Sequence, residues 1–511
     1  MRITFVVVVV VGSLALACAP PGPGARKQAP LTPLPALTHV VTTLDKTLVP
    51  AHPPTPGELN PAIPENTQAY LDAGLGDLND GPGEPITVRT LDGSAAPARG
   101  PNAHRLTRFV HLADIQLMDD ESPMRTADFD SQSVTSAIRP HDPFLCLMLN
   151  AAVRTINGLN DADPVDFVLL GGDIADSAQT NEVQWAMAIL DGSPDVHCDS
   201  GDDNDIDPHG PDGKDHFAAA GLAMPWHWVS GNHDALVQGT FGIDPSQQST
   251  SVGGFAQLGT RVYAGGGFGI IADGDVVTPD ARRKVLTGDA LIDLVQHDGD
   301  GHGLKNADAS AGKAFHSFDV PGSPITFLAL DTNHAVGGAE GVLKQSDIDK
   351  FVTPVLDDAK ARNRVVVIAS HHAVDALSSD GGLLGQAEAD ALLPNDWLAY
   401  LGGYPNVLFS MVGHAHRNQV RKQVTPSHPY WEVMTAALAD FPHQFRVVEI
   451  WDDDNGTLRL ETSVVDYAVD DDAPAARGRA LGLIDLLSGW QGNDGRGQVT
   501  DRNVALIIPK P

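Results

Sequence analysis

The sequence has few basic residues and few cysteines, and both shortages narrow the range of functions. It has 33 Lys and Arg residues against 66 Asp and Glu residues, so its formal net charge is −33. A surface of this kind repels nucleic acid polymers and anionic lipid headgroups, and it keeps a protein soluble. Since 42% of the 511 residues are hydrophobic, the chain can still bury a large core. We therefore expect one large domain with appendages.

The chain also lacks an apolar run long enough for a permanent membrane anchor near its start. A spanning helix needs roughly 20 apolar residues, and the run after Arg2, from Ile3 to Ala17, is shorter and leads directly into a Pro-rich segment. Residues 1–18 are therefore predicted to be a signal peptide of an exported protein. Cys18 after Ala17 resembles a bacterial lipobox, which predicts a periplasmic or cell-surface protein held at the membrane by a lipid on Cys18. Simple cleavage after Ala17 is the alternative.

Without Cys18, only Cys146 and Cys198 remain, and in an oxidising compartment they either pair or stay buried. No CxxC or Cys/His cluster supports a zinc site of the thiolate kind. No P-loop or Gly-x-Ser-x-Gly motif is present. The aspartates at 203, 205 and 207 have calcium-loop spacing, but Pro208 and Lys214 stand where an EF-hand needs Gly and Glu.

The composition divides the chain into an arm, a catalytic domain and an extension. Residues 19–104 are rich in Pro, Thr, Ala and Gly, which predicts a tether or a loosely packed arm. Residues 105–465 are predicted to form the catalytic domain, and residues 466–511 a C-terminal extension. Short apolar segments alternate with helical stretches such as 181–190 and 345–360, which predicts an α/β fold. The predicted strands are 109–113, 167–170, 226–229, 325–330, 365–369 and 407–412, with closing strands at 445–450 and 458–462. Segments 195–214 and 264–303 are predicted to be loops.

Polar clusters follow five of these strands directly. In chain order they are Asp114-Ile115-Gln116, Gly172-Asp173-Ile174-Ala175-Asp176, Gly231-Asn232-His233-Asp234, His371-His372 and Gly413-His414-Ala415-His416. Carboxylate and amide oxygens together with neutral imidazoles suit Mn, Fe or Zn. Two such metals supply what phosphoryl transfer needs, positive charge at the nonbridging oxygens and a nucleophile at neutral pH.

The order of these motifs resembles that of the calcineurin-like metallophosphoesterase superfamily, over roughly residues 105–465. The resemblance implies a four-layer αββα sandwich with two divalent metal ions. It further implies hydrolysis of phosphomonoesters or phosphodiesters by in-line attack of a metal-bridging hydroxide.

The resemblance also implies a set of metal ligands. Asp173 matches the residue that bridges the two ions. Asp114, Gln116 and His416 would complete the ligand set of the first metal, and Asn232, His371 and His414 that of the second. His371 directly follows its strand and Ser370 and is expected to be the ligand of the adjacent pair, with His372 touching the substrate or supporting the site; the reverse is the alternative.

His233 matches the proton donor of the family, which protonates the leaving alkoxide, and Asp234 is expected to orient its ring. Asp176 is expected to support its loop. Because Asp176 is not Tyr, the pattern argues against the tyrosinate-iron purple acid phosphatase branch.

Gln116 is the departure from the family pattern, which more often has a metal-binding His there. An amide oxygen is a weaker donor than imidazole, so the first metal site is expected to prefer Mn or Fe(II) over Zn and to be under-occupied without added metal. Gln116 binding a water on the metal is the alternative.

The sequence does not identify the substrate, because the segments at 195–225 and 235–310 match no known recognition pattern. We expect a small phosphate ester as the substrate, and the sequence implies no protein partner. Too little chain follows His416 for the extra domain of large two-domain nucleotidases. The alternative from another class is a surface lipoprotein whose metal site serves binding or structure.

Overall fold

The computed structural model describes residues 31–61, 63–130, 135, 137–201, 213–242, 244–260, 274–296, 302–334 and 336–511. The predicted signal peptide with Cys18 and the aspartates with calcium-loop spacing lie outside these ranges. Within them, no helix combines the length and the apolar composition that a membrane span requires.

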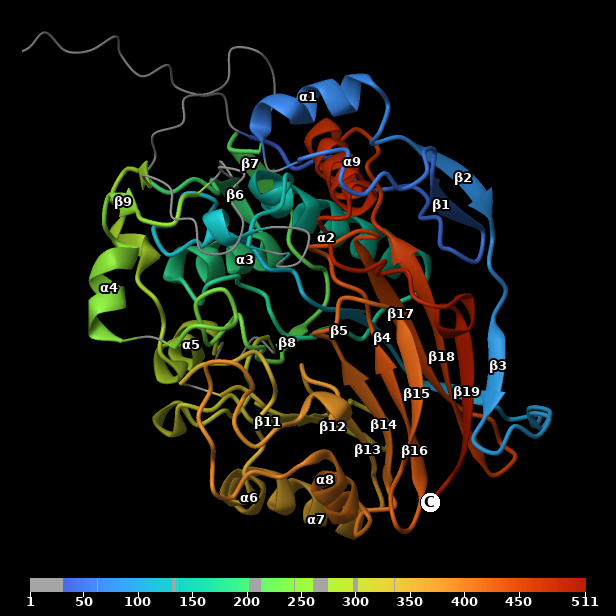
Figure 1. Ribbon diagram of the computed structural model, residues 1–511. Coiled ribbons are helices and arrows are strands. Elements are labelled where there is room, and N and C mark those ends of the chain that lie inside the picture. The colour runs from blue at the N-terminus through green and yellow to red at the C-terminus, as the bar shows by residue number, and fades with distance from the viewer. Residues whose placement is uncertain are drawn as a thin grey trace, which may run out of the picture.

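Two large mixed sheets face each other at the centre of the molecule (Figure 1). In spatial order, the seven-stranded sheet consists of β3 (Thr87–Thr90), β19 (Val504–Pro509), β18 (Thr457–Asp466), β17 (Gln444–Asp452), β4 (His104–Leu112), β5 (Phe167–Leu170) and β8 (Trp226–Trp228). The six-stranded sheet consists of β11 (His316–Asp319), β12 (Ile325–Ala329), β13 (Val365–Ala369), β14 (Val407–Val412), β16 (Pro429–Met434) and β15 (Gln419–Val424).

Helices cover the outer face of each sheet. The principal helices are α1 (Pro64–Asp72), α2 (Leu145–Ala162), α3 (Thr180–Asp191), α4 (Pro245–Ser251), α5 (Gly288–Val295), α6 (Gln345–Asp347), α7 (Thr353–Ala361), α8 (Pro394–Leu401) and α9 (Ala473–Ser488). Three small two-stranded antiparallel sheets are formed by β1 (Lys46–Pro50) with β2 (Leu78–Pro82), β6 (Ser193–Val196) with β7 (Phe217–Ala219), and β9 (Phe255–Ala256) with β10 (Asp275–Val276).

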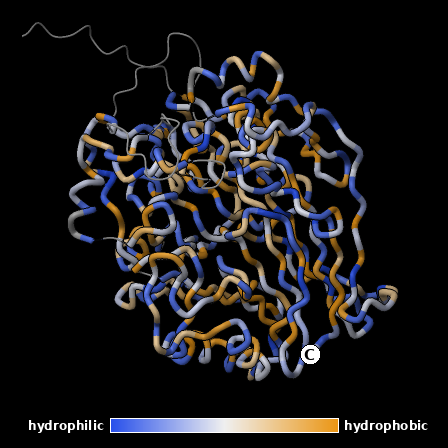
Figure 2. Tube along the Cα trace, viewed as in Figure 1, coloured by the Kyte–Doolittle hydropathy of each residue, from blue (hydrophilic) through white to orange (hydrophobic). Residues whose placement is uncertain are grey.

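Three buried apolar layers follow from the alternation of side chains along the strands. In β4, Phe109 packs between the two sheets against Phe327 of β12, whereas Val110 faces α2, α3 and α9 on the other side. A third layer packs β12 and β13 against α7 and α8. Figure 2 shows apolar positions concentrated along the central strands. The order helix, sheet, sheet, helix confirms the predicted four-layer αββα sandwich.

The predicted strands of the catalytic domain are all present, and the strands predicted near 445–450 and 458–462 are β17 and β18. The prediction that 264–303 is a loop was wrong in part. It contains α5, which buries Leu291, Ile292 and Val295 in the core. The helix is short and begins with Gly288 and Asp289, which are more typical of loops, so its apolar residues did not predict a helix from the sequence.

The large sheet includes strands from outside both the N-terminal and the C-terminal boundary of the predicted catalytic domain. β3, from the segment predicted to be a tether or loose arm, pairs in parallel with β19 from the C-terminal extension. The indole N–H of Trp490 donates to the carbonyl of Leu59 at 3.1 Å, so the two segments also meet outside the sheet. The described part of the arm, together with the extension, therefore belongs to the catalytic core.

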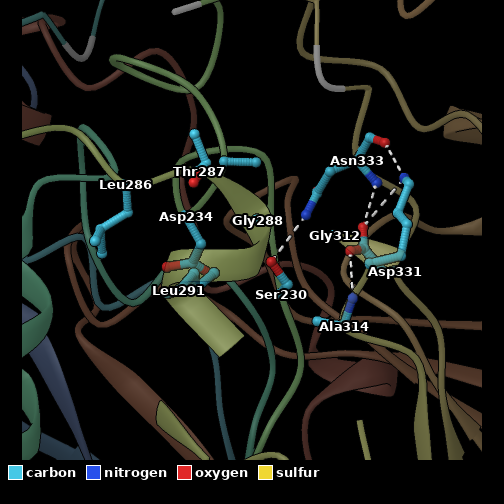
Figure 3. Close-up of a pocket in the computed structure, with 12 residues that line it drawn as sticks. Ser230, Asp234, Leu286, Thr287, Gly288, Leu291, Gly312, Ala314, Asp331 and Asn333 are labelled. Atoms are coloured by element: carbon cyan, nitrogen blue, oxygen red, sulfur yellow. Dashed lines mark hydrogen bonds and ion pairs between the residues drawn. The ribbon is translucent and has the colours of Figure 1, made fainter. Parts of the chain in front are cut away.

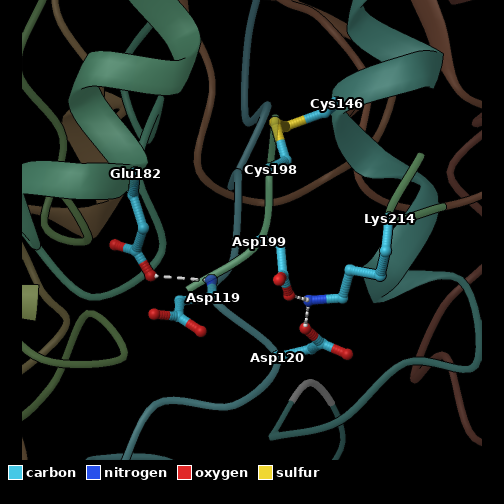
Figure 4. Close-up of a disulfide and its surroundings, with 7 residues drawn as sticks. All are labelled: Asp119, Asp120, Cys146, Glu182, Cys198, Asp199 and Lys214. Carbon is cyan, nitrogen blue, oxygen red and sulfur yellow. Dashed lines mark hydrogen bonds and ion pairs between the residues drawn. A yellow bond between two sulfur atoms is a disulfide. The ribbon is translucent and has the colours of Figure 1, made fainter. Parts of the chain in front are cut away.

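A disulfide joins Cys146 of α2 to Cys198, 52 residues further along the chain (Figure 4). It holds the segment after β6 against α2, next to a buried ionic network. Ser200 donates to Asp119 at 2.7 Å, and Arg283 donates to the other oxygen of Asp119 at 2.9 Å. Because Asp119 lies five residues after Asp114, the network supports the loop that carries the first motif.

Candidate metal centre

The five motifs meet at a common edge of the two sheets. β4, β5 and β8 are parallel neighbours in the large sheet, and β12, β13 and β14 are parallel neighbours in the small one. Asp114, Asp173 and Asn232 follow strands of the first set, and His371 and His414 follow strands of the second. Since the carboxyl ends of parallel strands lie at the same edge, the sandwich brings the predicted residues together.

The local backbone is strained to achieve this convergence. Five non-glycine residues of the site have φ between 46° and 73°, in the left-handed region: Asp114, Gln116, Asp173, His414 and His416. Such conformations cost of order 1 kcal/mol each and persist where the surrounding structure enforces them. Gly172 shows the crowding, because a Cβ there would lie 2.4 Å from Nδ1 of His371.

Asp114, Asp173 and His416 form a first group that could hold a metal ion, with ligand atoms within 4.8 Å of one another. Nε2 of His416 lies 3.2 Å from Oδ1 of Asp114. Both carboxylates are buried, and backbone N–H groups orient them. The N–H of His414 donates to Asp114 at 3.1 Å, and that of His233 donates to Asp173 at 2.8 Å.

His371, His372 and His414 form the second such group. Nδ1 of His371 donates to the carbonyl of Gly171 at 2.9 Å, which leaves Nε2 as the ring atom that could bind a metal, 3.0 Å from Oδ2 of Asp173. Both nitrogens of His372 are engaged instead, Nδ1 by the hydroxyl of Thr332 at 2.7 Å and Nε2 by the carbonyl of Ala339 at 3.1 Å. The hydrogen bonds favour His371 over His372 as the ligand of the pair.

Asn232 presents an oxygen without a hydrogen-bond partner. Its side chain is buried, and Nδ2 donates to the carbonyl of Gly239 at 2.9 Å, but Oδ1 has no partner. A buried polar atom in this state is costly unless a ligand satisfies it. The atom that a divalent cation would use is therefore the atom left free.

The potential in this centre is strongly negative. Burial lowers the pKa of His371, but Asp173 and Asp114 outweigh it and raise the pKa to about 9. Burial is likewise outweighed at His416, where Asp440 and Asp114 raise the pKa to about 10. Burial and the neighbouring His371 lower the pKa of His414 to about 4, which keeps its imidazole neutral. Carboxylates, an amide oxygen and imidazoles in a negative potential fit hard or borderline divalent cations, which would displace the protons that His371 and His416 hold without metal.

The residue that orients His233 is Asp176, and the prediction that Asp234 does so was wrong. Nδ1 of His233 lies 2.7 Å from the carbonyl oxygen of Asp176 and 3.2 Å from its carboxylate. The carboxylate of Asp234 instead accepts four backbone N–H groups, from Gly231, Asp173, Ile174 and Ala175, at 2.9–3.0 Å. Asp234 therefore ties the second motif to the third. Burial opposes the charge of His233, but Asp173 and Asp176 raise its pKa.

Gln116 lies in the first group with its oxygen turned away from the carboxylates. Oε1 accepts from Nη2 of Arg139 at 2.7 Å, and Nε2 lies 3.4 Å from Oδ2 of Asp173 and 3.3 Å from Nε2 of His416. The structure thus brings the residue to the predicted place but presents a nitrogen donor to the ligand cluster.

Sequence reasoning missed Asp440 and Arg139. Asp440 accepts from Nδ1 of His416 and from Nε of Arg139, both at 2.6 Å. Although burial opposes ionisation, Arg139 and His416 hold the pKa of Asp440 well below its usual range. The only sequence signal for Asp440 is its position a few residues after the apolar strand β16, as in the other motifs.

A cavity of about 450 Å³ opens onto the centre. Its described lining is polar: Gln116, Thr135, Arg139, Asp173, Asn232, His233, Gln238, Thr240, Ala339, His414, Ala415, His416, Arg417, Asp440, Asp485, Gln491, Gly492 and Asn493. Among these residues there is no Phe, Tyr or Trp. Asp485, Gln491 and Asn493 come from the C-terminal extension, so that segment forms part of the wall.

A second cavity, of about 160 Å³, lies behind the third motif (Figure 3). Ser230 and Asp234, the start of α5, and Asp331 and Asn333 line it. Nδ2 of Asn333 donates to Oγ of Ser230 at 2.9 Å, which anchors the chain just before Asn232.

The sequence pattern of the family described as calcineurin-like phosphoesterase matches residues 107–418, which is more than half of the chain. The chain therefore belongs to this family. The predicted family and the predicted class of enzyme, a hydrolase of phosphoric ester bonds, are confirmed. No curated protein sequence matches the chain significantly.

Solved structures similar to the chain include two phosphatases. A dimetal phosphatase from Danio rerio is 13% identical over 71% of this chain and 100% of its own, with a TM-score of 0.39. A purple acid phosphatase from yellow lupin (Lupinus luteus) seeds is 12% identical over 76% of this chain and 54% of its own, with a TM-score of 0.33.

Proposed function

We propose that the chain is an exported hydrolase of small phosphomonoesters or phosphodiesters that works with two divalent metal ions. Asp114, Asp173 and His416 would hold the first ion, and Asn232, His371 and His414 the second, with Asp173 shared. The observation that carries the proposal is the convergence of these six side chains from five strand ends, with Oδ1 of Asn232 buried and unpartnered.

The metals, when bound, would supply Lewis acidity and an activated nucleophile. The protein supplies orientation and a proton. His233, held through Nδ1 by Asp176, presents Nε2 to the cavity and would protonate the leaving oxygen. His372, with both nitrogens engaged by protein groups, supports the wall beside His371 and is not assigned to substrate.

The shape and lining of the cavity favour small, polar substrates. About 450 Å³ accommodates a small ester, and the described lining offers amides, hydroxyls and the exposed Arg417 rather than aromatic rings on which a nucleobase could stack. The net charge of −33 argues against polymeric nucleic acid. Export, and attachment to a membrane through a lipid on Cys18, are proposed from the N-terminal sequence alone.

Metal analysis combined with a substrate panel tests the proposal. The purified chain, stripped and then reloaded with Mn²⁺, Fe²⁺ or Zn²⁺, is expected to bind two ions and to hydrolyse glycerophosphate or a glycerophosphodiester faster than a mononucleotide. Two bound ions without hydrolysis of any ester in the panel would favour a metal-containing binding protein instead. Failure to bind metal would refute the proposal outright.

A further inference from the structure

The orientation of the Gln116 amide is fixed by Arg139. A guanidinium group has only donors, so the Gln116 atom 2.7 Å from Nη2 of Arg139 must be the oxygen. Arg139 is held in turn, because Nε donates to Asp440 at 2.6 Å and its backbone N–H donates to Asp142 at 2.9 Å. Rotating the amide by half a turn would set two donors against each other.

The amide NH₂ group therefore faces the metal-binding cluster. Nε2 lies 3.4 Å from Oδ2 of Asp173 and 3.3 Å from Nε2 of His416. An amide nitrogen has no lone pair to give to a cation, whereas its hydrogens bind oxygen well. In this orientation Gln116 cannot replace the histidine ligand of its relatives, but it can donate to an oxygen beside the metals.

The backbone holds Gln116 as firmly as it holds the ligands. Its φ is 46°, in the same strained region as Asp114 and Asp173, and its N–H donates to the carbonyl of Asp173 at 2.8 Å. Both Gln116 and Arg139 line the 450 Å³ cavity. A donor fixed in advance and directed at developing charge stabilises a transition state, because no reorganisation is needed when the reaction occurs.

We propose that Gln116 is a catalytic residue that donates a hydrogen bond from Nε2 to a nonbridging phosphoryl oxygen of the substrate, and that Arg139 is the positioning residue that locks the amide for this task. The inference rests on the proposed function, since it needs a phosphoryl group at the metal centre. It assigns Gln116 a role different from the metal-ligand role expected from its sequence position.

Two substitutions separate a donor from a ligand. Gln116→Ala removes the whole amide. Gln116→Glu keeps an oxygen for Arg139 but replaces the NH₂ group with a second, negatively charged oxygen. We expect both variants to bind as many Mn²⁺ ions per chain as the wild type in equilibrium dialysis. We expect kcat for a small phosphate ester to fall roughly 10²-fold, as for loss of a preorganised donor, and inhibition by inorganic phosphate to weaken.

His416→Ala serves as the control for loss of a ligand and is expected to bind fewer Mn²⁺ ions. If Gln116→Ala loses Mn²⁺ as His416→Ala does, Gln116 is a ligand, and if Gln116→Glu keeps full activity, the reaction needs no donor at this position; either result overturns the inference. Mn²⁺ binding by the wild type is measured before any variant is compared. A wild-type chain that binds no Mn²⁺ would refute the proposed function rather than the role of Gln116.

Discussion

The carboxylate of Asp440 lies 2.6 Å from Nδ1 of His416 and fixes the direction of that ring. With Nδ1 donating to the carboxylate, Nε2 is directed at Asp114 at 3.2 Å and is the atom that a metal ion would bind in place of a proton. Carboxylates that hold metal-binding histidines in this way also raise the basicity of the imidazole. Asp440 thus extends the proposed metal centre to the loop after β16.

Asp440→Asn is expected to weaken the first metal site by about 10- to 100-fold while leaving the fold intact. The amide that replaces the carboxylate cannot accept well from His416 and Arg139 at once. Mn²⁺ titration of the stripped protein measures the change. Asp453→Asn is the matched control. It alters another buried carboxylate, which pairs with Arg459 at a distance of 2.9 Å and does not line the cavity. Equal Mn²⁺ affinity in wild type and Asp440→Asn would contradict the role.

Asp173→Asn is expected to abolish hydrolysis and to release metal. The carboxylate lies between the two groups, with Oδ2 3.0 Å from Nε2 of His371, and a neutral amide bridges two cations poorly. Metal content after dialysis and turnover are measured together. A variant that keeps both ions and its activity would refute the assignment of Asp173 as the shared ligand.

The exchange of roles between Asp176 and Asp234 gives a kinetic test. His233→Ala is expected to keep the metals and to slow turnover by roughly 10²- to 10⁴-fold, most for esters with poor leaving groups. Asp176→Asn should show the same dependence on the leaving group in weaker form, because it removes the charge beside Nδ1. Equal losses across leaving groups would argue against His233 as the proton donor.

Asp234→Asn is expected to act on stability instead. Its carboxylate accepts four backbone N–H groups, and an amide would turn an NH₂ group toward some of them. We expect the free energy of unfolding to fall by about 1.5–3 kcal/mol, as for loss of a charge-assisted bond. Denaturant titration measures this free energy, with Asp176→Asn as the comparison variant. If Asp234→Asn is as stable as the wild type but loses most activity on esters with poor leaving groups, Asp234 rather than Asp176 would be the residue that orients His233.

The sequence predicted the site residues that lie next to buried strands, because strand ends in one sheet must meet at one edge. It could not predict contacts between loops. Arg139 lies 23 residues from Gln116, and Asp440 lies 24 residues from His416, so only the folded chain brings them together. Which carboxylate faces His233 depends on the turn geometry of two motifs, which short patterns do not encode. The pairing of β3 with β19 likewise joins segments that look like appendages in the sequence.

The disulfide is expected to stabilise the domain that carries the site. Cys146 and Cys198 close a long loop, and closing a loop of this length stabilises a folded chain by about 2–4 kcal/mol. The paired variant Cys146→Ala, Cys198→Ala should unfold at lower denaturant concentration, and a reducing agent should lower the stability of the wild type but not of the variant. Equal stability of oxidised and reduced wild type would contradict the prediction.

The absence of an imidazole at position 116 leads to a final prediction about metal demand. Because Gln116 does not supply the strong nitrogen ligand that relatives more often have there, the purified chain is expected to gain activity with added Mn²⁺. Gln116→His should tighten that site and lower the Mn²⁺ concentration needed for half-maximal metal binding. The gain should stay partial, because a metal-bound imidazole would turn its N–H toward the guanidinium of Arg139, which accepts no hydrogen bond. Mn²⁺ binding curves of both proteins measure this difference, with Gln238→His as the control on another cavity-lining glutamine. If the wild type already holds two ions tightly and the curve of Gln116→His is unchanged, position 116 does not set the affinity of the first site.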